Sequence, residues 1–122
     1  MIVTEINGNK TNPPSTLNVI GRIKRLDGKK ITELTLCDSS QSHVMVIAGG
    51  PEHFLVDVHV NGEYFALQNP EGKPEVYHRF VAAGQNVDCS DDTTPTLSQT
   101  TKAARYFCEH GTPDPSLKWM KT

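Results

Sequence analysis

The stretch that decides the fold is residues 54–67, Phe-Leu-Val-Asp-Val-His-Val-Asn-Gly-Glu-Tyr-Phe-Ala-Leu. Every second residue of its first half is large and apolar, which is the period of a half-buried β-strand. The Asn61-Gly62 pair that follows is the strongest short sequence feature for a tight hairpin turn. Residues 63–67 are therefore expected to run back antiparallel to the first strand.

The segments around this hairpin extend the same sheet. A two-residue period predicts a strand at 31–37, and a more continuous apolar run predicts a central strand at 43–48. A further strand is expected at 75–81, after a loop rich in proline and glycine at 69–74. Together these segments predict an antiparallel sheet of about five or six strands.

Two helices are expected beside the sheet. The first has Ser15 as its N-cap, apolar positions at Leu17, Ile20 and Ile23, and Gly28 as its stop. The second covers residues 97–110. Its apolar stripe of Leu97, Ala103, Ala104, Phe107 and Cys108 ends before Gly111.

The whole chain of 122 residues is expected to form one domain, because it is too short for two hydrophobic cores. Its fold class is α+β, with an antiparallel sheet, an N-terminal helix and a C-terminal helix. Polar composition predicts a flexible stretch at 7–14 and a polar, acidic loop at 84–96. The tail after the second helix is expected to place the Trp119 indole against the sheet.

Charge is unevenly distributed along the chain, although the formal net charge is only −2. Residues 1–30 hold six basic side chains against two acidic ones, a net charge of +4. Residues 31–92 hold two basic side chains against ten acidic ones, a net charge of −8. The acidic middle would repel nucleic-acid phosphates and attract a basic partner.

The sequence offers no pattern for catalysis or metal binding. His53, Asp57 and His59 share strand parity, but the two histidines stand about 20 Å apart along an extended strand, too far for one metal ion. The three cysteines are not closely spaced and no nucleophile elbow is present. We therefore expect no catalytic residues, no metal and no cofactor.

No apolar run approaches the ~20 residues of a membrane-spanning helix. The first residues also lack the basic start and long apolar stretch of a secretory signal. The expected location is cytoplasmic, without membrane contact.

Five segments, taken in order and spacing, carry a family resemblance. They are Leu-Asp-Gly-Lys-Lys-Ile-Thr-Glu-Leu-Thr-Leu at 26–36, Ala-Gly-Gly-Pro at 48–51, the strand at 54–60, Ala-Ala-Arg-Tyr-Phe at 103–107 and Asp-Pro-Ser-Leu-Lys-Trp at 114–119. Over roughly residues 13–119 the chain resembles a family of bacterial immunity proteins encoded beside polymorphic toxins, most of whose toxin domains belong to the deaminase superfamily.

The resemblance implies an α+β fold and an inhibitor without enzyme activity. Gly49 and Gly50 correspond to the family's turn and Trp119 to its C-terminal tryptophan, all as fold determinants. Met120 stands where the family often has an acidic residue.

The implied function is stoichiometric neutralisation of a cognate toxin, a basic nucleic-acid deaminase, in a 1:1 complex that covers its active site or substrate groove. Such deaminases admit a base into a zinc-containing pocket. This chain itself lacks the deaminase His-x-Glu and Pro-Cys-x-x-Cys patterns. The acidic residues expected to face the toxin are Asp57, Glu63, Glu71, Glu75, Asp88, Asp91 and Asp92.

Two alternatives remain at this stage. One is a small-molecule-binding domain or enzyme with a pocket lined by Tyr64, Tyr77, His78 and Phe80. The other is a regulatory domain that binds nucleic acid through the basic residues of segment 22–30.

Overall fold

The structure is a computed structural model, and it describes residues 2–5, 10–11, 16–38, 40 and 42–122. Its elements follow in the order β1 (Ile2–Glu5), β2 (Lys10–Thr11), α1 (Thr16–Lys24), β3 (Glu33–Cys37), β4 (His43–Gly49), β5 (Phe54–Val60), β6 (Glu63–Leu67), β7 (Tyr77–Ala82), β8 (Gln85–Ser90), a 3-10 helix (Asp91–Thr93), α2 (Leu97–His110) and β9 (Trp119–Lys121). The fold class is α+β, as predicted.

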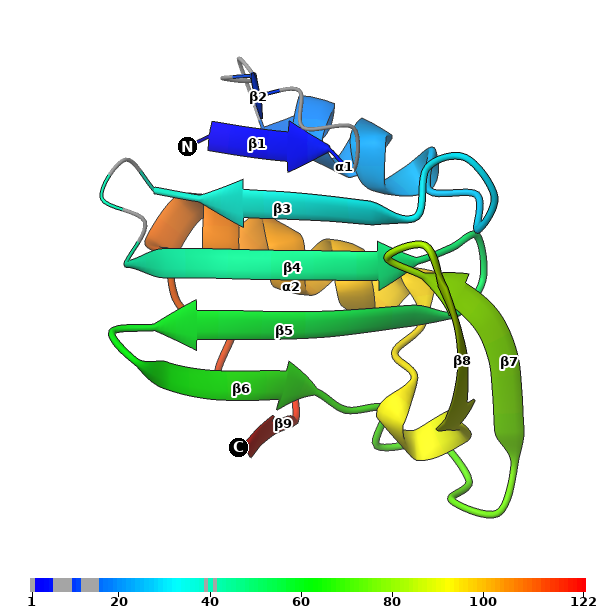
Figure 1. The fold of residues 1–122 in the computed structure, drawn as a ribbon. Helices are drawn as coiled ribbons and strands as arrows, with labels where there is room; N and C mark the ends of the chain where they lie inside the picture. Colours follow the sequence, from blue (N-terminus) through cyan, green and yellow to red (C-terminus); the bar gives the residue numbers. More distant parts are fainter. Residues whose placement is uncertain (1, 6–9, 12–15, 39, 41) are drawn as a thin grey trace.

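The main sheet is antiparallel, with the strand order β2-β1-β3-β4-β5-β6-β9 (Figure 1). Five of its strands, β1 and β3–β6, have four or more residues, and the short strands β2 and β9 form the two edges. The predicted strand at 75–81 does not join this sheet, contrary to expectation: it corresponds to β7, which pairs with β8 in a separate two-stranded sheet. The centre of the main sheet is a meander in which consecutive strands pair.

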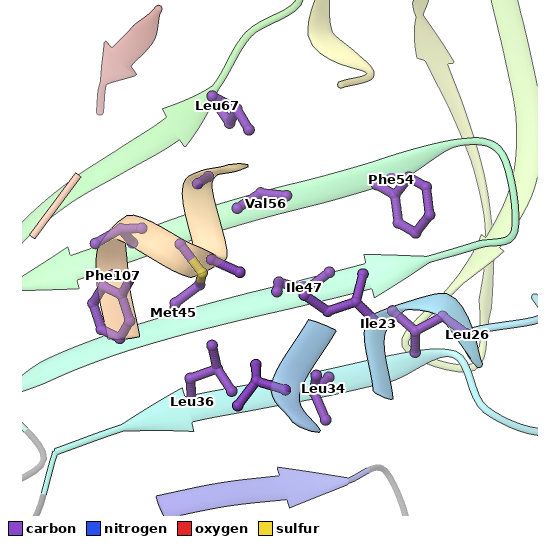
Figure 2. Close-up of a cluster of buried hydrophobic side chains, with 14 residues drawn as sticks. Ile23, Leu26, Leu34, Leu36, Met45, Ile47, Phe54, Val56, Leu67 and Phe107 are labelled. Carbon is purple, nitrogen blue, oxygen red and sulfur yellow. The ribbon is translucent and has the colours of Figure 1, made fainter. Parts of the chain in front are cut away.

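Both helices lie on the same face of the main sheet, behind it in Figure 1. The core fills the space between helices and sheet (Figure 2). Alternate residues of the strands point into it, as the two-residue period predicted, and Phe54 and Phe107 are fully buried there. In the part of the chain that the structure describes, no helix lies on the other face of the sheet, and we call this the open face.

The helix α1 is shorter than predicted. It ends at Lys24 instead of near Gly28. The Asp27 carboxylate accepts hydrogen bonds from three following backbone N–H groups at 2.9–3.1 Å, which begins a turn and lowers the pKa of Asp27. The predicted N-cap, Ser15, lies outside the described residues.

The prediction that Leu17 faces the core is wrong, since 71% of this side chain is exposed. A three-residue spacing rotates by about 60° per step on a helix with 3.6 residues per turn. Leu17 therefore stands well away from Ile23, which is fully buried. Val19 and Ile20 complete the buried stripe.

Segment 84–96 is not a loop throughout, contrary to expectation. It contains β8 and the 3-10 helix. Ala83 and Gly84 both have positive φ angles, 52° and 76°, the backbone of a type I′ hairpin turn. The N–H groups of Ala83 and Gly84 donate to the backbone and side-chain oxygens of Thr32, which anchors the hairpin tip beside β3.

The C-terminal part agrees closely with the sequence. The helix α2 spans the predicted residues and ends at Gly111, whose φ of 73° is left-handed. Trp119 packs against the core, as expected, but it does so from a short strand, β9. Of the predicted flexible stretch 7–14, only Lys10 and Thr11 are described, and they form β2.

Candidate protein-interaction surface

The open face carries apolar, polar and charged side chains, which are the alternate residues of β3–β6 and β9. One row across the strands follows directly from the register and consists of Thr35, Val46, Asp57, Ala66 and Met120. A neighbouring row holds Val44, His59 and Tyr64. Directly opposed side chains lie about 4.5–5.5 Å apart at their β-carbons, so each row is continuous.

Asp57 stands near the middle of the open face. Its cross-strand neighbours are Val46 and Ala66, and Leu55 precedes it on the same face. Its side chain is exposed by area, yet partial desolvation of the carboxyl raises its pKa, an effect that the nearby imidazole of His59 opposes. The carboxyl forms no hydrogen bond or ion pair with any described residue.

Two large side chains stand at the β6–β9 side of the open face. Tyr64 is 47% exposed and Met120 is 53% exposed. The Tyr64 ring meets the His59 imidazole edge to face, with ring centroids 4.2 Å apart. This contact positions the Tyr64 ring against His59, diagonally across the strands from Asp57. The sequence predicts Tyr64 only as a pocket-lining residue.

Five of the seven predicted acidic residues lie in loop 68–76, in β8 and in the 3-10 helix, three segments that meet at the base of the β7–β8 hairpin. Loop 68–76 packs there against the 3-10 helix, where the Asn69 N–H donates to the Asp92 carbonyl (2.8 Å) and the Lys73 N–H to an Asp91 carboxylate oxygen (3.0 Å). We call this region, at the lower right of Figure 1, the acidic corner; its acidic members are Glu71, Glu75, Asp88, Asp91 and Asp92.

The carboxylates of the acidic corner differ in their exposure to solvent and in their partners. Glu71 and Glu75 are exposed. Asp88 lies 3.8 Å from the Arg79 guanidinium across the hairpin. Asp92 is half-buried, and its Oδ1 atom is enclosed without a hydrogen bond from the described residues.

Asp91 contacts a pair of stacked histidines that no sequence pattern predicts. The His78 Nε2 lies 2.7 Å from Asp91 Oδ1, and the His53 ring stacks on His78 with centroids 4.0 Å apart. The hydrogen bond from His78 lowers the pKa of Asp91. Desolvation, and then the nearby His78, lower the pKa of His53. These residues are far apart in the sequence, so only the folded chain unites them.

Asp57 and Glu63 lie outside the acidic corner. Glu63 is on β6, where its carboxylate accepts a 2.9 Å hydrogen bond from the Lys121 ammonium of β9. The interface predicted from charge is therefore divided into the acidic corner, an open-face residue and an ion pair at the sheet edge.

Gly49, Gly50 and Trp119, which the resemblance implies as fold determinants, all make close contacts within the fold. A β-carbon on Gly49 would collide with the His53 carbonyl, and one on Gly50 with the carbonyl of Leu26. The Trp119 indole N–H donates to the Asp114 carbonyl at 2.9 Å.

The predicted aromatic pocket is not assembled. Tyr77 is on the outer face of the β7–β8 hairpin, opposite to His78 and Phe80, and Tyr64 is on the open face. An open hollow of about 490 Å³ is instead lined by Arg79, Asn86, Val87 and Asp88.

The Cys89 thiol is poorly suited to act as a nucleophile, although a histidine lies opposite it. Cys89 is directly opposite His78 in the hairpin register, but desolvation raises the pKa of its thiol, the reverse of what a nucleophile requires. Within the described residues no group of three or more histidine, cysteine or acidic side chains could hold a metal ion. No helix of the described chain is long and apolar enough to cross a membrane.

Comparison of the chain with known proteins does not assign it to a family. No protein-family model matches the chain, and no curated protein does so.

Proposed function

We propose that the chain is an immunity protein that neutralises a cognate bacterial toxin, a nucleic-acid deaminase, by stoichiometric binding. It acts without turnover of its own, in a 1:1 complex that covers the active site or substrate groove. The resemblance over residues 13–119 supplies the class of partner, and the acidic corner is the observation that supports it in the structure.

The acidic corner suits a surface that normally binds nucleic acid. A deaminase groove must attract phosphates, so it carries basic side chains. Glu71 and Glu75 present carboxylates from one exposed loop, where they would meet such side chains in place of phosphates. Binding there would keep the target base out of the catalytic pocket.

The test titrates the toxin domain encoded beside this chain with the purified protein and measures deamination of single- and double-stranded nucleic acid. Activity is expected to disappear at one equivalent. Activity that persists at large excess would contradict the proposal.

A charge-reversed variant tests the role of the acidic corner. Glu71→Lys with Glu75→Lys should raise the Kd at least about tenfold, or about 1.4 kcal/mol. The matched control is Glu109→Lys. Glu109 is also exposed, but it lies about 18 Å along α2 from the helix end next to the corner. Equal affinities for the double variant and the control would contradict the role of the corner.

A further inference from the structure

The open face combines exposed apolar side chains with one carboxylate, that of Asp57, for which the described residues provide no hydrogen bond or ion pair. Around Asp57 the register places Val46 and Ala66, with Met120 next to Ala66. Tyr64 and Leu55 extend this apolar surround on the same face. Nothing in the described chain covers these residues with a helix, since α1 and α2 both lie on the other face (Figure 1).

Several acidic side chains form an ion pair or hydrogen bond with a basic side chain, and Asp57 does not do so with any described residue. Asp91 has His78, Glu63 has Lys121 and Asp88 has Arg79. Asp57 has no such partner among the described residues, and its neighbours displace water without replacing water's hydrogen bonds. A partly desolvated carboxylate of this kind gains most from a cation supplied from outside.

The chemistry of the surround narrows the kind of ligand. Exposed tyrosine and methionine beside half-buried apolar side chains are typical of protein interfaces. A carboxylate at the centre repels nucleic-acid phosphates and lipid headgroups alike. A guanidinium matches a carboxylate with two parallel hydrogen bonds, whereas an ammonium offers a point charge.

We propose that the open face is the principal docking surface for the toxin, which places an arginine side chain on Asp57 within an apolar contact formed by Tyr64, Met120 and Val46. This inference rests on the proposed function and specifies which surface performs it. The acidic corner, whose loop begins where β6 ends, then attracts the toxin, and the open face holds it.

The experiment measures the Kd of the same toxin domain for the wild-type chain and for two open-face variants. Asp57→Asn keeps the shape and removes the charge, and it is expected to weaken binding at least about tenfold. Tyr64→Ala combined with Met120→Ala removes the two exposed anchors and is expected to have an effect of at least the same size.

Each variant has a matched control on the covered side of the sheet. Glu109→Gln removes an exposed carboxylate from α2, and Leu17→Ala truncates an exposed apolar side chain on α1. Both controls should bind within about twofold of the wild type. Thermal melting checks the fold. Asp57→Asn should not lower the melting temperature, because desolvation of the carboxylate outweighs the favourable effect of the His59 imidazole in the folded chain.

The outcomes separate this inference from the proposed function. Tight wild-type binding that both open-face variants retain would overturn the docking surface and leave the immunity function standing. A wild-type chain that does not bind the toxin would overturn both. Loss of binding in the open-face variants, with melting temperatures and controls unchanged, is the expected result.

Discussion

Gly50 shows how one residue is fixed by what surrounds its backbone. Its φ is +95°, and a β-carbon there would collide with the Leu26 carbonyl oxygen and lie 2.6 Å from the carbonyl carbon. Gly28 faces it in turn, because a β-carbon on Gly28 would lie 2.6 Å from the Gly50 oxygen. The turn that follows α1 and the β4–β5 turn therefore touch backbone to backbone.

Replacement of Gly50 by alanine should destabilise the fold strongly. The positive φ alone costs an L-residue about 1–2 kcal/mol, and the collision with Leu26 adds to this. Gly62→Ala is the matched control, because Gly62 has a φ of +86° but open space around it. Urea denaturation compares the two free energies of unfolding, and equal losses would show that the close contact is unimportant.

The sequence predicts a turn at Gly50 but not why glycine is required there. A Gly-Gly-Pro triplet between two apolar strands indicates a turn from local chemistry alone. The close approach of residue 26 depends on how α1 crosses the sheet, which no local pattern contains. For the same reason the strand parity of Asp57 was predictable, whereas its lack of a hydrogen-bond or ion-pair partner among the described residues was not.

At the scale of elements, the β7–β8 hairpin was the least predictable part. Its second strand has few apolar residues, and its Ala-Gly turn lacks the usual Asn-Gly or Asp-Gly pattern. Tertiary contacts hold it instead, through Thr32 at the tip and through the stack of His53 on His78 at the base. By contrast, α2 was predictable because its amphipathic stripe and its Gly111 stop are both local.

The attachment of this hairpin should make stability depend on pH. The pKa of His53 is lower in the folded chain than the ordinary value of 6.5. As the pH falls from about 7 to about 5, the unfolded chain takes up a proton that folded His53 does not, so the free energy of unfolding decreases. His53→Phe keeps a stacking ring and should flatten this decrease.

A second variant, Glu52→Gln, should make stability depend more strongly on pH, the opposite of His53→Phe. The Glu52 carboxylate raises the pKa of His53 and so partly offsets its lowering. Glu52→Gln removes that offset and should steepen the loss of stability below about pH 6.5. Thermal melting across this range measures both variants, and identical slopes in all three proteins would show that His53 does not couple pH to folding.

Over the whole molecule, charge is separated in space as well as in sequence. The basic residues of α1 lie at the top of Figure 1, and the acidic corner lies at the lower right. Segment totals predicted the sign of the middle region. They did not predict the division of its carboxylates between exposed, paired and enclosed sites, because pairing depends on strand register and loop packing.

This charge separation should appear in the rate of complex formation. Wild-type association with the toxin domain should slow about tenfold as salt rises from about 0.05 to about 0.5 M, because screening weakens long-range attraction. Glu71→Lys with Glu75→Lys should associate more slowly and depend less on salt. Stopped-flow kinetics provides the measurement, and a salt-independent wild-type rate would contradict electrostatic attraction by the corner.

The strand order also sets the order in which the sheet can assemble. The β3–β6 strands are joined by short connections, so each pairing closes a small loop at low entropic cost. The β9 strand pairs with β6 only after the hairpin and α2 have intervened, and β1 pairs with β3 across α1. We therefore expect folding to start from the central meander, with the edges of the sheet joining last and opening first.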